Sequence, residues 1–253
     1  MEGRQGHRPR RRGIAGFVVA ACTVAGIGFA SPVGAGRVSG SRVPGGRGAV
    51  IVPPSVVHTS WRSPEMMTKD ALPRHDVLRD KAVDALTAYE NFIASRDPRV
   101  ADRYQRALTV VVSIVAARTF VSRSEMLDAW QSASLRHQKA ILVGMTTLGT
   151  GYLFGSDNPK KGLDCSGLVA YAWAKAGVAL PMKSDRQLDH GRAIERSQAH
   201  AGDIVGYPGH SMIYLGVGDI VLHSARPNMG VRVGPINWKE SPNVRFADPT
   251  PGD

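Results

Sequence analysis

The stretch DCSGLV at residues 164–169 decides the fold of the second half of this chain. Apolar residues recur after it at helical spacing, until Gly177 and Pro181 end the pattern. We therefore predict a helix that begins at Cys165. Asp164 is its expected N-cap, because an aspartate side chain accepts hydrogen bonds from the free N–H groups of a first helical turn. The apolar positions of this helix are Leu168, Val169, Ala172, Trp173 and Ala176.

Cys165 is expected to be the only cysteine of the mature protein, since Cys22 lies in an N-terminal stretch typical of a removable export signal. A lone thiol in an exported protein has no disulfide partner within its own chain. At a helix start, the free N–H groups and the positive end of the helix dipole favour the thiolate, which is the reactive form. Free cysteines are also among the most buried residue types, so an inert residue packed under the helix start is the alternative.

Residues 1–35 have the three parts of an export signal. Residues 1–12 contain five arginines against a single acid, and residues 13–30 are uncharged and mostly apolar. Small residues follow, and cleavage is expected after Ala30 or Ala35. We therefore expect a secreted protein, or one that stays in the cell wall or periplasm. One alternative is a membrane anchor through residues 13–30, although this run is somewhat short for a membrane span of about 20 residues. The other is a lipoprotein attached at Cys22.

The net charge of +11 is spread unevenly along the chain. Residues 36–143 hold sixteen basic and ten acidic side chains, whereas residues 144–253 hold eleven and ten. A basic exported protein is attracted to anionic polymers or membranes of the cell envelope through long-range fields. Contact with such polymers is one expectation, and a modest excess of solvated arginines is the alternative. The sequence has no basic run with interleaved aromatic residues, so nucleic acid is not an expected partner.

The sequence downstream of the signal divides into three expected segments. Residues 36–64 are rich in Gly, Pro and Ser and are typical of a linker or a disordered arm. Residues 65–133 are expected to form a helical accessory segment, because apolar stripes at helical spacing predict two or three helices from about residue 73 onward. The third helix is expected to start near Ser122 and to run towards Leu148. The remaining residues, 134–253, suffice for one compact domain with its own core.

Two of the eight histidines lie in strand-like sequence, and a thiolate nucleophile needs a base that exchanges protons near neutral pH. His210 opens the alternating stretch HSMIYLG, and His223 ends the apolar stretch IVLH. The sequence GVGD between these stretches is typical of a hairpin turn. The two histidines are therefore predicted on neighbouring antiparallel strands, where one is able to orient the other. Either histidine alone is more often an ordinary core or surface residue.

Four blocks of the sequence stand out by their order and approximate spacing. They are GTGYLFG at residues 149–155, LDCSGLV at 163–169, GDIV at 202–205 and HSMIYLG at 210–216, and a weaker fifth block combines Leu180 and Pro181 with Ser184 and Gln187. Over roughly residues 134–240 the chain resembles the NlpC family, which are papain-like bacterial cell-wall cysteine peptidases. The resemblance implies an α+β fold. In that fold a papain-like NlpC-type domain packs its nucleophile helix on an antiparallel sheet, and here a helical segment precedes it.

The resemblance also implies roles for single residues. Cys165 is the expected nucleophile and His210 its general base, while His223 orients His210 and stabilises its charged form. Tyr152 matches a tyrosine that helps to stabilise the oxyanion, and the N–H of Cys165 is a second donor. An ordinary buried aromatic residue is the alternative for Tyr152. The expected substrate-binding residues are Asp164, Ser166 and Ser184.

The implied reaction is cleavage of an amide bond in the stem peptides of peptidoglycan during cell-wall remodelling. The usual bond in this family joins the γ-carboxyl of D-glutamate to diaminopimelate. No cofactor and no metal are expected, and the sequence holds no metal-ligand spacing pattern. One alternative is a related thiol amidase or acyltransferase that acts on another amide, and a second is a non-catalytic module that binds the wall.

Three departures from the family pattern concern the surroundings of the site. Met212 replaces the small residue usual two positions after the histidine, which is expected to change the packing behind His210. Met182 with Lys183 replaces the Arg-Thr pair usual after Leu-Pro, which is expected to change substrate contacts. The turn before His223 is one residue longer than usual, which is expected to affect the register of His223. The helices before residue 144 are expected to restrain the enzyme or position it on the wall. The equally weighted alternative is that they bury apolar surface of the domain.

Overall fold

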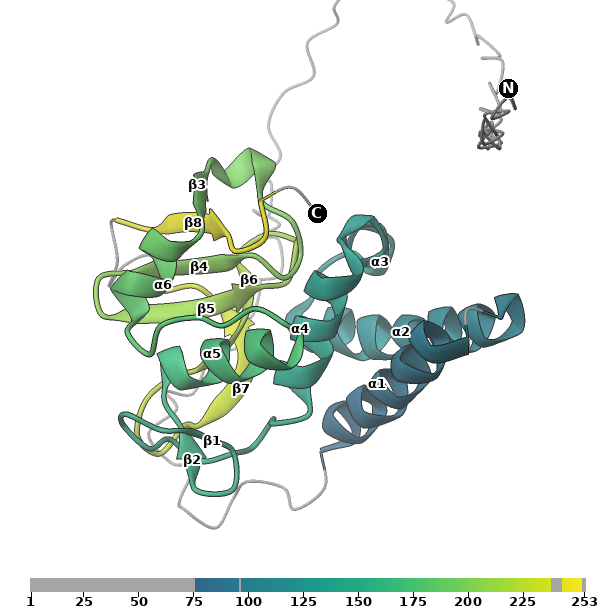
Figure 1. Ribbon diagram of the computed structural model, residues 1–253, viewed down its shortest axis with the longest axis horizontal. Coiled ribbons are helices and arrows are strands. Elements are labelled where there is room, and N and C mark those ends of the chain that lie inside the picture. Colours follow the sequence, from purple (N-terminus) through teal and green to yellow (C-terminus); the bar gives the residue numbers. More distant parts are fainter. Residues whose placement is uncertain (1–75, 96, 238–242, 252–253) are drawn as a thin grey trace, which may run out of the picture. The chain divides into compact units, whose positions relative to one another are not determined.

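The computed structural model describes residues 76–95, 97–237 and 243–251 of the chain (Figure 1). These residues belong to one compact unit. The predicted export signal, residues 1–35, and the predicted arm, residues 36–64, lie outside the described residues. In the described part of the chain, no helix combines the length and apolar character needed to cross a membrane.

Four helices form the first half of the described chain, and their starts follow from capping residues. The N–H of Arg99 donates to Asp97 Oδ1 at 2.8 Å, and Pro98 occupies the first helical position, where a missing N–H costs nothing. This cap opens the second helix, which packs along the first. The helices are α1 (Val77–Ser95), α2 (Pro98–Thr119), α3 (Arg123–Ser132) and α4 (Leu135–Met145).

The expected third helix is in fact two helices, α3 and α4, so the prediction of one continuous helix from Ser122 towards Leu148 was wrong. Ala133 and Ser134 have extended backbone conformations between them. The Ser134 side chain starts a new helix, because its Oγ accepts a hydrogen bond from the N–H of His137 at 3.4 Å. A serine that caps the next helix therefore ends the previous one.

The second half of the described chain is a six-stranded antiparallel sheet with helices α5 (Cys165–Lys175) and α6 (Ser184–His190) packed against it. Asp164 caps α5 as predicted, and the predicted hairpin is found in the antiparallel pairing of β5 with β6. The α+β prediction is confirmed. The strands are β3 (Arg192–Ile194), β4 (Ile204–Tyr207), β5 (His210–Tyr214), β6 (Ile220–Ser224), β7 (Val231–Pro235) and β8 (Arg245–Asp248), in the order β3-β8-β4-β5-β6-β7; a separate small hairpin joins β1 (Asp157–Asn158) to β2 (Gly162–Leu163).

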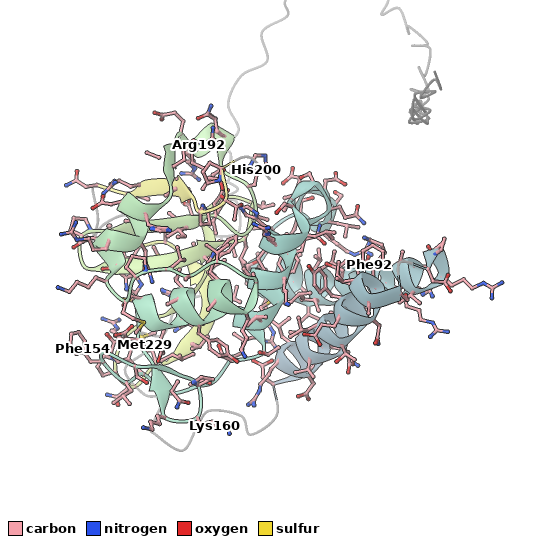
Figure 2. The ribbon with its side chains drawn as sticks, in the orientation of Figure 1. Phe92, Phe154, Lys160, Arg192, His200 and Met229 are labelled. Atoms are coloured by element: carbon pink, nitrogen blue, oxygen red, sulfur yellow. The ribbon has the colours of Figure 1, made fainter. Side chains whose placement is uncertain are left out.

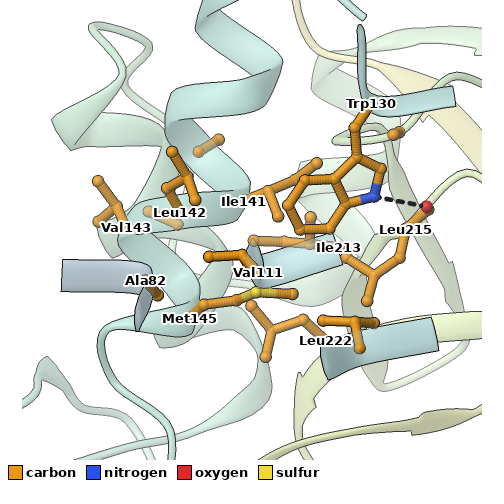
Figure 3. Packing of buried hydrophobic residues seen from close by; sticks show 14 of the residues in the cluster. Ala82, Val111, Trp130, Ile141, Leu142, Val143, Met145, Ile213, Leu215 and Leu222 are labelled. Carbon is orange, nitrogen blue, oxygen red and sulfur yellow. Dashed lines mark hydrogen bonds between the residues drawn. The ribbon is translucent and has the colours of Figure 1, made fainter. Parts of the chain in front are cut away.

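Helix α4 packs closely on the sheet because Gly144 has no side chain. A Cβ at this position would lie 2.7 Å from Leu222 Cδ2 and 3.4 Å from Ile213 Cδ1. Both residues belong to a hydrophobic core that extends from α1 and α2 through α4 and α5 to the sheet, and Figure 3 shows Met145 and Leu222 among the residues of this core. The upstream helices and the sheet therefore share one core.

Trp130 on α3 adds a directed contact to this shared core. Its side chain is fully buried, and its Nε1–H donates to the carbonyl oxygen of Leu215 at 3.0 Å (Figure 3). This bond joins the upstream helices to the segment that follows β5. The packing thus favours the alternative in which the helices bury apolar surface of the domain, while a restraining role stays a prediction.

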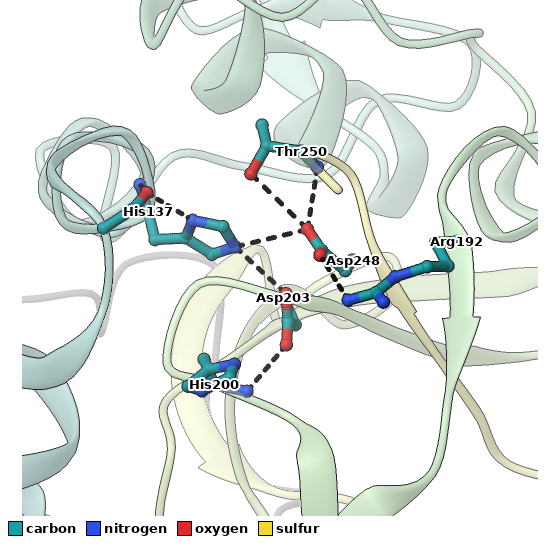
Figure 4. Close-up of polar contacts among 7 residues, drawn as sticks. His137, Arg192, His200, Asp203, Asp248 and Thr250 are labelled. Carbon is teal, nitrogen blue, oxygen red and sulfur yellow. Dashed lines mark hydrogen bonds and ion pairs between the residues drawn. The ribbon is translucent and has the colours of Figure 1, made fainter. Parts of the chain in front are cut away.

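A buried polar cluster also fastens α4 to the sheet (Figure 4). His137 Nε2 lies 3.0 Å from Asp203 Oδ1, just before β4, and 3.9 Å from Asp248 Oδ1, at the end of β8. The other ring nitrogen of His137 is 2.8 Å from Ser134 Oγ. Hydrogen bonds occupy both nitrogens of this buried ring, so it contributes to the attachment of α4 without an unpaired polar atom.

We predict that Trp130→Phe lowers the free energy of unfolding more than Trp173→Phe does. Both indoles are fully buried, but among the described residues Trp173 Nε1 has no hydrogen-bond partner, whereas Trp130 Nε1 bonds Leu215. Only Trp130→Phe leaves a buried carbonyl unpaired, at an added cost of about 1–3 kcal/mol. Urea unfolding of both variants measures the difference, and equal losses would show that the bond contributes nothing.

Candidate active site

The start of α5 is built around the carboxylate of Asp164. Its Oδ1 accepts the N–H of Gly167 at 2.6 Å, and its Oδ2 accepts the N–H of Gly155 at 2.6 Å. One carboxylate therefore caps the helix and fixes the preceding loop against it. Gly167 permits this approach, since a Cβ there would lie only 2.0 Å from the carbonyl oxygen of Ser156. The loop that carries Tyr152 thus packs directly on the turn that carries Cys165.

The Cys165 thiol lies beside the backbone on both sides of His210. Its Sγ donates to the carbonyl oxygen of Gly209 at 3.8 Å, and the N–H of Ser211 is near enough to act on the pKa of the thiol. Burial raises the pKa of the thiol above its ordinary value; the N–H groups of Ser211, Ser166 and Cys165 act against this, and the charge of Asp164 adds to it. The resting side chain is therefore a thiol at neutral pH.

His210 and His223 meet as predicted from the two strands. His210 Nε2 lies 3.2 Å from His223 Nδ1. This contact leaves Nδ1 of His210 without a hydrogen-bond partner among the described residues, and it is the nitrogen available to a substrate or to the thiol. No hydrogen bond joins Cys165 Sγ to the His210 ring in the described part of the site, so proton transfer requires the two groups to approach each other.

Both imidazoles are neutral at pH 7. Burial lowers the pKa of His210 to about 4, although the nearby Asp164 carboxylate acts in the opposite direction. Burial also lowers the pKa of His223 to about 3, and the positive charges of His210 and Arg232 lower it further. Arg232 faces His223 across the β6–β7 pair. Tyr207 faces His210 across the β4–β5 pair, with ring centroids 5.2 Å apart.

Tyr152 lies within electrostatic reach of the thiol. Its side chain is half-buried, and burial raises the pKa of its phenol, as do the negative charges of Cys165 and Asp164. The next two residues are exposed, Leu153 by 44% and Phe154 by 86% (Figure 2). Backbone hydrogen bonds join residues 149 and 150 to Val231, which places this loop beside the one that carries Met229.

The three predicted substrate-binding residues are all buried. Asp164 is only 4% exposed, and both its oxygens accept the backbone bonds described above. Ser166 Oγ lies 2.9 Å from the carbonyl oxygen of Met182 and 3.0 Å from Asp164 Oδ1. Ser184 is the first residue of α6. In this structure Asp164 and Ser166 hold the helix start together, and their contact with substrate stays a prediction.

Gln187 is a residue to which sequence reasoning assigned no role. It is fully buried on α6, although a glutamine in a short polar helix is typical of a surface position. Its amide contacts the residue after Cys165 and the residue after His210. Its spacing from Ser184 in the weak fifth block was the only sequence signal that pointed to it.

The residues that have metal-ligand geometry lie away from the thiol. Among the described residues, His137, Asp203 and Asp248 form a group whose ligand atoms lie within 4.8 Å of one another. Asp248 already pairs with Arg192 at 3.2 Å and accepts the N–H of Thr250 at 2.8 Å (Figure 4). A guanidinium beside the group opposes a bound cation, so the cluster is sufficiently explained as the fastening of α4.

Comparison with known proteins identifies the region that holds this site. Residues 149–242 match the model of the NlpC/P60 family. The chain is 38% identical over 109 residues to the peptidoglycan endopeptidase RipA of Mycobacterium tuberculosis. This alignment covers 37% of the present chain and 23% of RipA. It is 30% identical over 147 residues to the gamma-DL-glutamyl hydrolase of Bacillus subtilis, which covers 54% of this chain and 34% of that enzyme.

Among solved structures, that of Rv1477, described as a hypothetical invasion protein of Mycobacterium tuberculosis, aligns with a TM-score of 0.40 and 30% identity. The alignment covers 45% of this chain and 61% of that chain. The present chain spans between 23% and 34% of the length of the two curated relatives above. The resemblance to the NlpC family that the sequence blocks predict is confirmed over residues that include Cys165, His210 and His223.

We predict that the rate at which iodoacetamide alkylates Cys165 rises with pH, with a midpoint above that of an ordinary cysteine. The physical reason is burial, which raises the thiol pKa and so leaves little thiolate at neutral pH. In residues 36–253 Cys165 is the single cysteine, and the same protein unfolded in urea supplies the reference midpoint. A rate that already reaches its plateau at neutral pH would contradict a resting thiol.

Proposed function

We propose that this chain is an exported cysteine peptidase that cleaves an amide bond in peptidoglycan stem peptides. The bond proposed is the one between the γ-carboxyl of D-glutamate and diaminopimelate. The observation that carries the proposal is the arrangement of Cys165 at the start of α5 against the His210–His223 pair. The names of two relatives, a peptidoglycan endopeptidase and a gamma-DL-glutamyl hydrolase, support the substrate class.

The first chemical step joins the sulfur to the scissile carbonyl carbon. As Sγ of Cys165 attacks, its proton passes to Nδ1 of His210, because Nε2 of that ring already faces His223. His210 then carries a positive charge beside a neutral acceptor, Nδ1 of His223. The positive charge on His210 and the negative charge on the former carbonyl oxygen thus arise only during the reaction, when the approaching substrate displaces water from the site.

Two donors are proposed for the negative oxygen of the tetrahedral intermediate, the N–H of Cys165 and the phenol of Tyr152. Burial and neighbouring negative charges raise the pKa of this phenol, so it keeps its proton and remains a donor at neutral pH. His210 next returns the proton to the leaving amine as the C–N bond breaks and a thioester forms. Water, deprotonated by His210, then hydrolyses the thioester and restores the thiol.

The location and the wall contact belong to the same proposal. Residues 1–35 direct export and are removed, which leaves a secreted or wall-associated enzyme. Basic residues between 36 and 143 favour anionic polymers of the envelope, close to the peptidoglycan substrate.

The test is mass spectrometry of soluble muropeptides incubated with residues 36–253 and with the Cys165→Ala variant. The proposal predicts that the wild type releases fragments with a new diaminopimelate amino group and that Cys165→Ala releases none, because no other group supplies the nucleophile. Ser132→Ala is a matched control, since Ser132 lies on α3 and its hydroxyl bonds the carbonyl of Ala129.

Each other outcome overturns a defined part of the proposal. Cleavage that persists in Cys165→Ala contradicts the nucleophile. A cut between muramic acid and L-alanine indicates an amidase instead of the proposed endopeptidase. Binding of muropeptides by the wild type without any cleavage indicates a wall-binding module.

A further inference from the structure

The Gln187 side chain makes three hydrogen bonds to three separate segments. Its Nε2 donates to the carbonyl oxygen of Ser166 at 2.8 Å and to that of Pro181 at 2.8 Å, and its Oε1 accepts the hydroxyl of Ser211 at 2.7 Å. Gln187 and Ser211 are both fully buried. The orientation of the amide follows from its partners, because two carbonyl oxygens require the NH₂ group on their side.

The segments joined in this way are the ones that carry the reacting groups. Ser166 follows Cys165 in the first turn of α5, and Ser211 follows His210 on β5. Cys165 Sγ in turn donates to the carbonyl oxygen of Gly209, the residue before His210, and the N–H of Ser211 acts to lower the pKa of the thiol. One buried amide therefore connects the residue after the nucleophile with the residue after the base.

The connection matters because the thiol and the imidazole do not hold each other. Within the described residues no hydrogen bond joins Cys165 Sγ to His210, so the backbone segments beneath the two side chains determine their separation. Helix α6, which carries Gln187, packs on α5, β4 and β5. These contacts place the amide between the two segments.

We propose that Gln187 is a positioning residue for the thiol and imidazole: its amide sets the separation of the α5 turn that carries Cys165 and the β5 strand that carries His210. It touches neither reacting atom. The hydrolytic consequence rests on the proposed function, but the effect on the chemistry of the thiol does not. The competing explanation is that Gln187 only satisfies buried polar groups, in which case its loss lowers stability and leaves the folded site unchanged.

The experiment measures the rate of Cys165 alkylation by iodoacetamide at one alkaline pH, at a temperature where each variant is folded by circular dichroism. Gln187→Met keeps the length of the side chain and removes all three bonds. The matched control is Gln138→Met. Gln138 is also a buried glutamine, but it lies on α4, and its side chain bonds the carbonyl of Ala133 and the hydroxyl of Tyr104. We expect Gln187→Met to slow alkylation on the order of ten-fold or more, because a shift of the α5 turn relative to β5 takes the thiol away from the Ser211 N–H that favours its thiolate, and one unit of thiol pKa is a factor of about ten in thiolate.

Gln138→Met is expected to lower stability while the alkylation rate stays within about two-fold of the wild type. A folded Gln187→Met variant that reacts at the wild-type rate would overturn the proposal. A faster reaction would overturn it too, because it would mean that the amide only shields the thiol.

Ser211→Ala provides a milder second variant, which removes one of the three bonds. It is expected to slow alkylation in the wild-type background and to have little further effect in Gln187→Met, because its contribution passes through the amide. If Ser211→Ala slows alkylation as strongly in the Gln187→Met background as in the wild type, the proposal is contradicted. If Gln187→Met does not fold, Ser211→Ala alone decides, and a wild-type alkylation rate in that variant contradicts the proposal.

The same variants are then assayed on muropeptides, where a positioning role lowers kcat and leaves KM nearly unchanged. If the wild type cleaves no muropeptide while alkylation still depends on Gln187, the proposed function fails and the positioning role stands. If muropeptides are cleaved equally well by wild type and Gln187→Met, the positioning role fails and the proposed function stands.

Discussion

The site depends on the two hydrogen bonds that the carboxylate of Asp164 accepts. One comes from the first turn of α5 and the other from the loop before it. A buried carboxylate is stable at a helix start because free N–H groups and the helix dipole replace its hydration. The close approach also requires Gly167, since any Cβ there would collide with the Ser156 carbonyl. The thiol of Cys165 and the phenol of Tyr152 are thereby placed on two segments that cannot separate while this contact holds.

Burial has opposite consequences for the two reacting groups. It raises the pKa of the Cys165 thiol and lowers that of the His210 imidazole, so both are uncharged at rest. A neutral pair costs less to bury than an ion pair, but it provides no charge attraction to hold the groups together. Their placement must then come from the backbone and from buried polar contacts, and the Gln187 amide is a buried contact that reaches both sides.

Local sequence patterns predicted the elements that carry the chemistry. The apolar spacing after Cys165 and the aspartate before it identified α5 and its cap, and alternation around GVGD identified the β5–β6 hairpin that joins His210 to His223. The break between α3 and α4 was missed, because Ser134 is one serine among several and becomes a cap only through its bond to His137.

The role of Gln187 and the His137–Asp203 contact were not predictable for a different reason. Their partners lie far away in sequence, and only the folded chain brings them together. The upstream helices illustrate the same limit: their apolar stripes were visible, but the Trp130 bond to Leu215 that ties them to the sheet was not. For Asp164 and Ser166, family resemblance suggested substrate contacts, whereas in the structure their side-chain oxygens form hydrogen bonds within the protein.

The most direct test of the account is to trap the covalent intermediate on Cys165. Residues 36–253 are mixed with a soluble muropeptide, quenched in acid at increasing times and analysed by mass spectrometry after digestion. The account predicts a thioester on the peptide that contains Cys165, with a mass that corresponds to the part of the stem ending at D-glutamate. An adduct on another residue, or an initial burst of product with no adduct on Cys165 at any quench time, would contradict it.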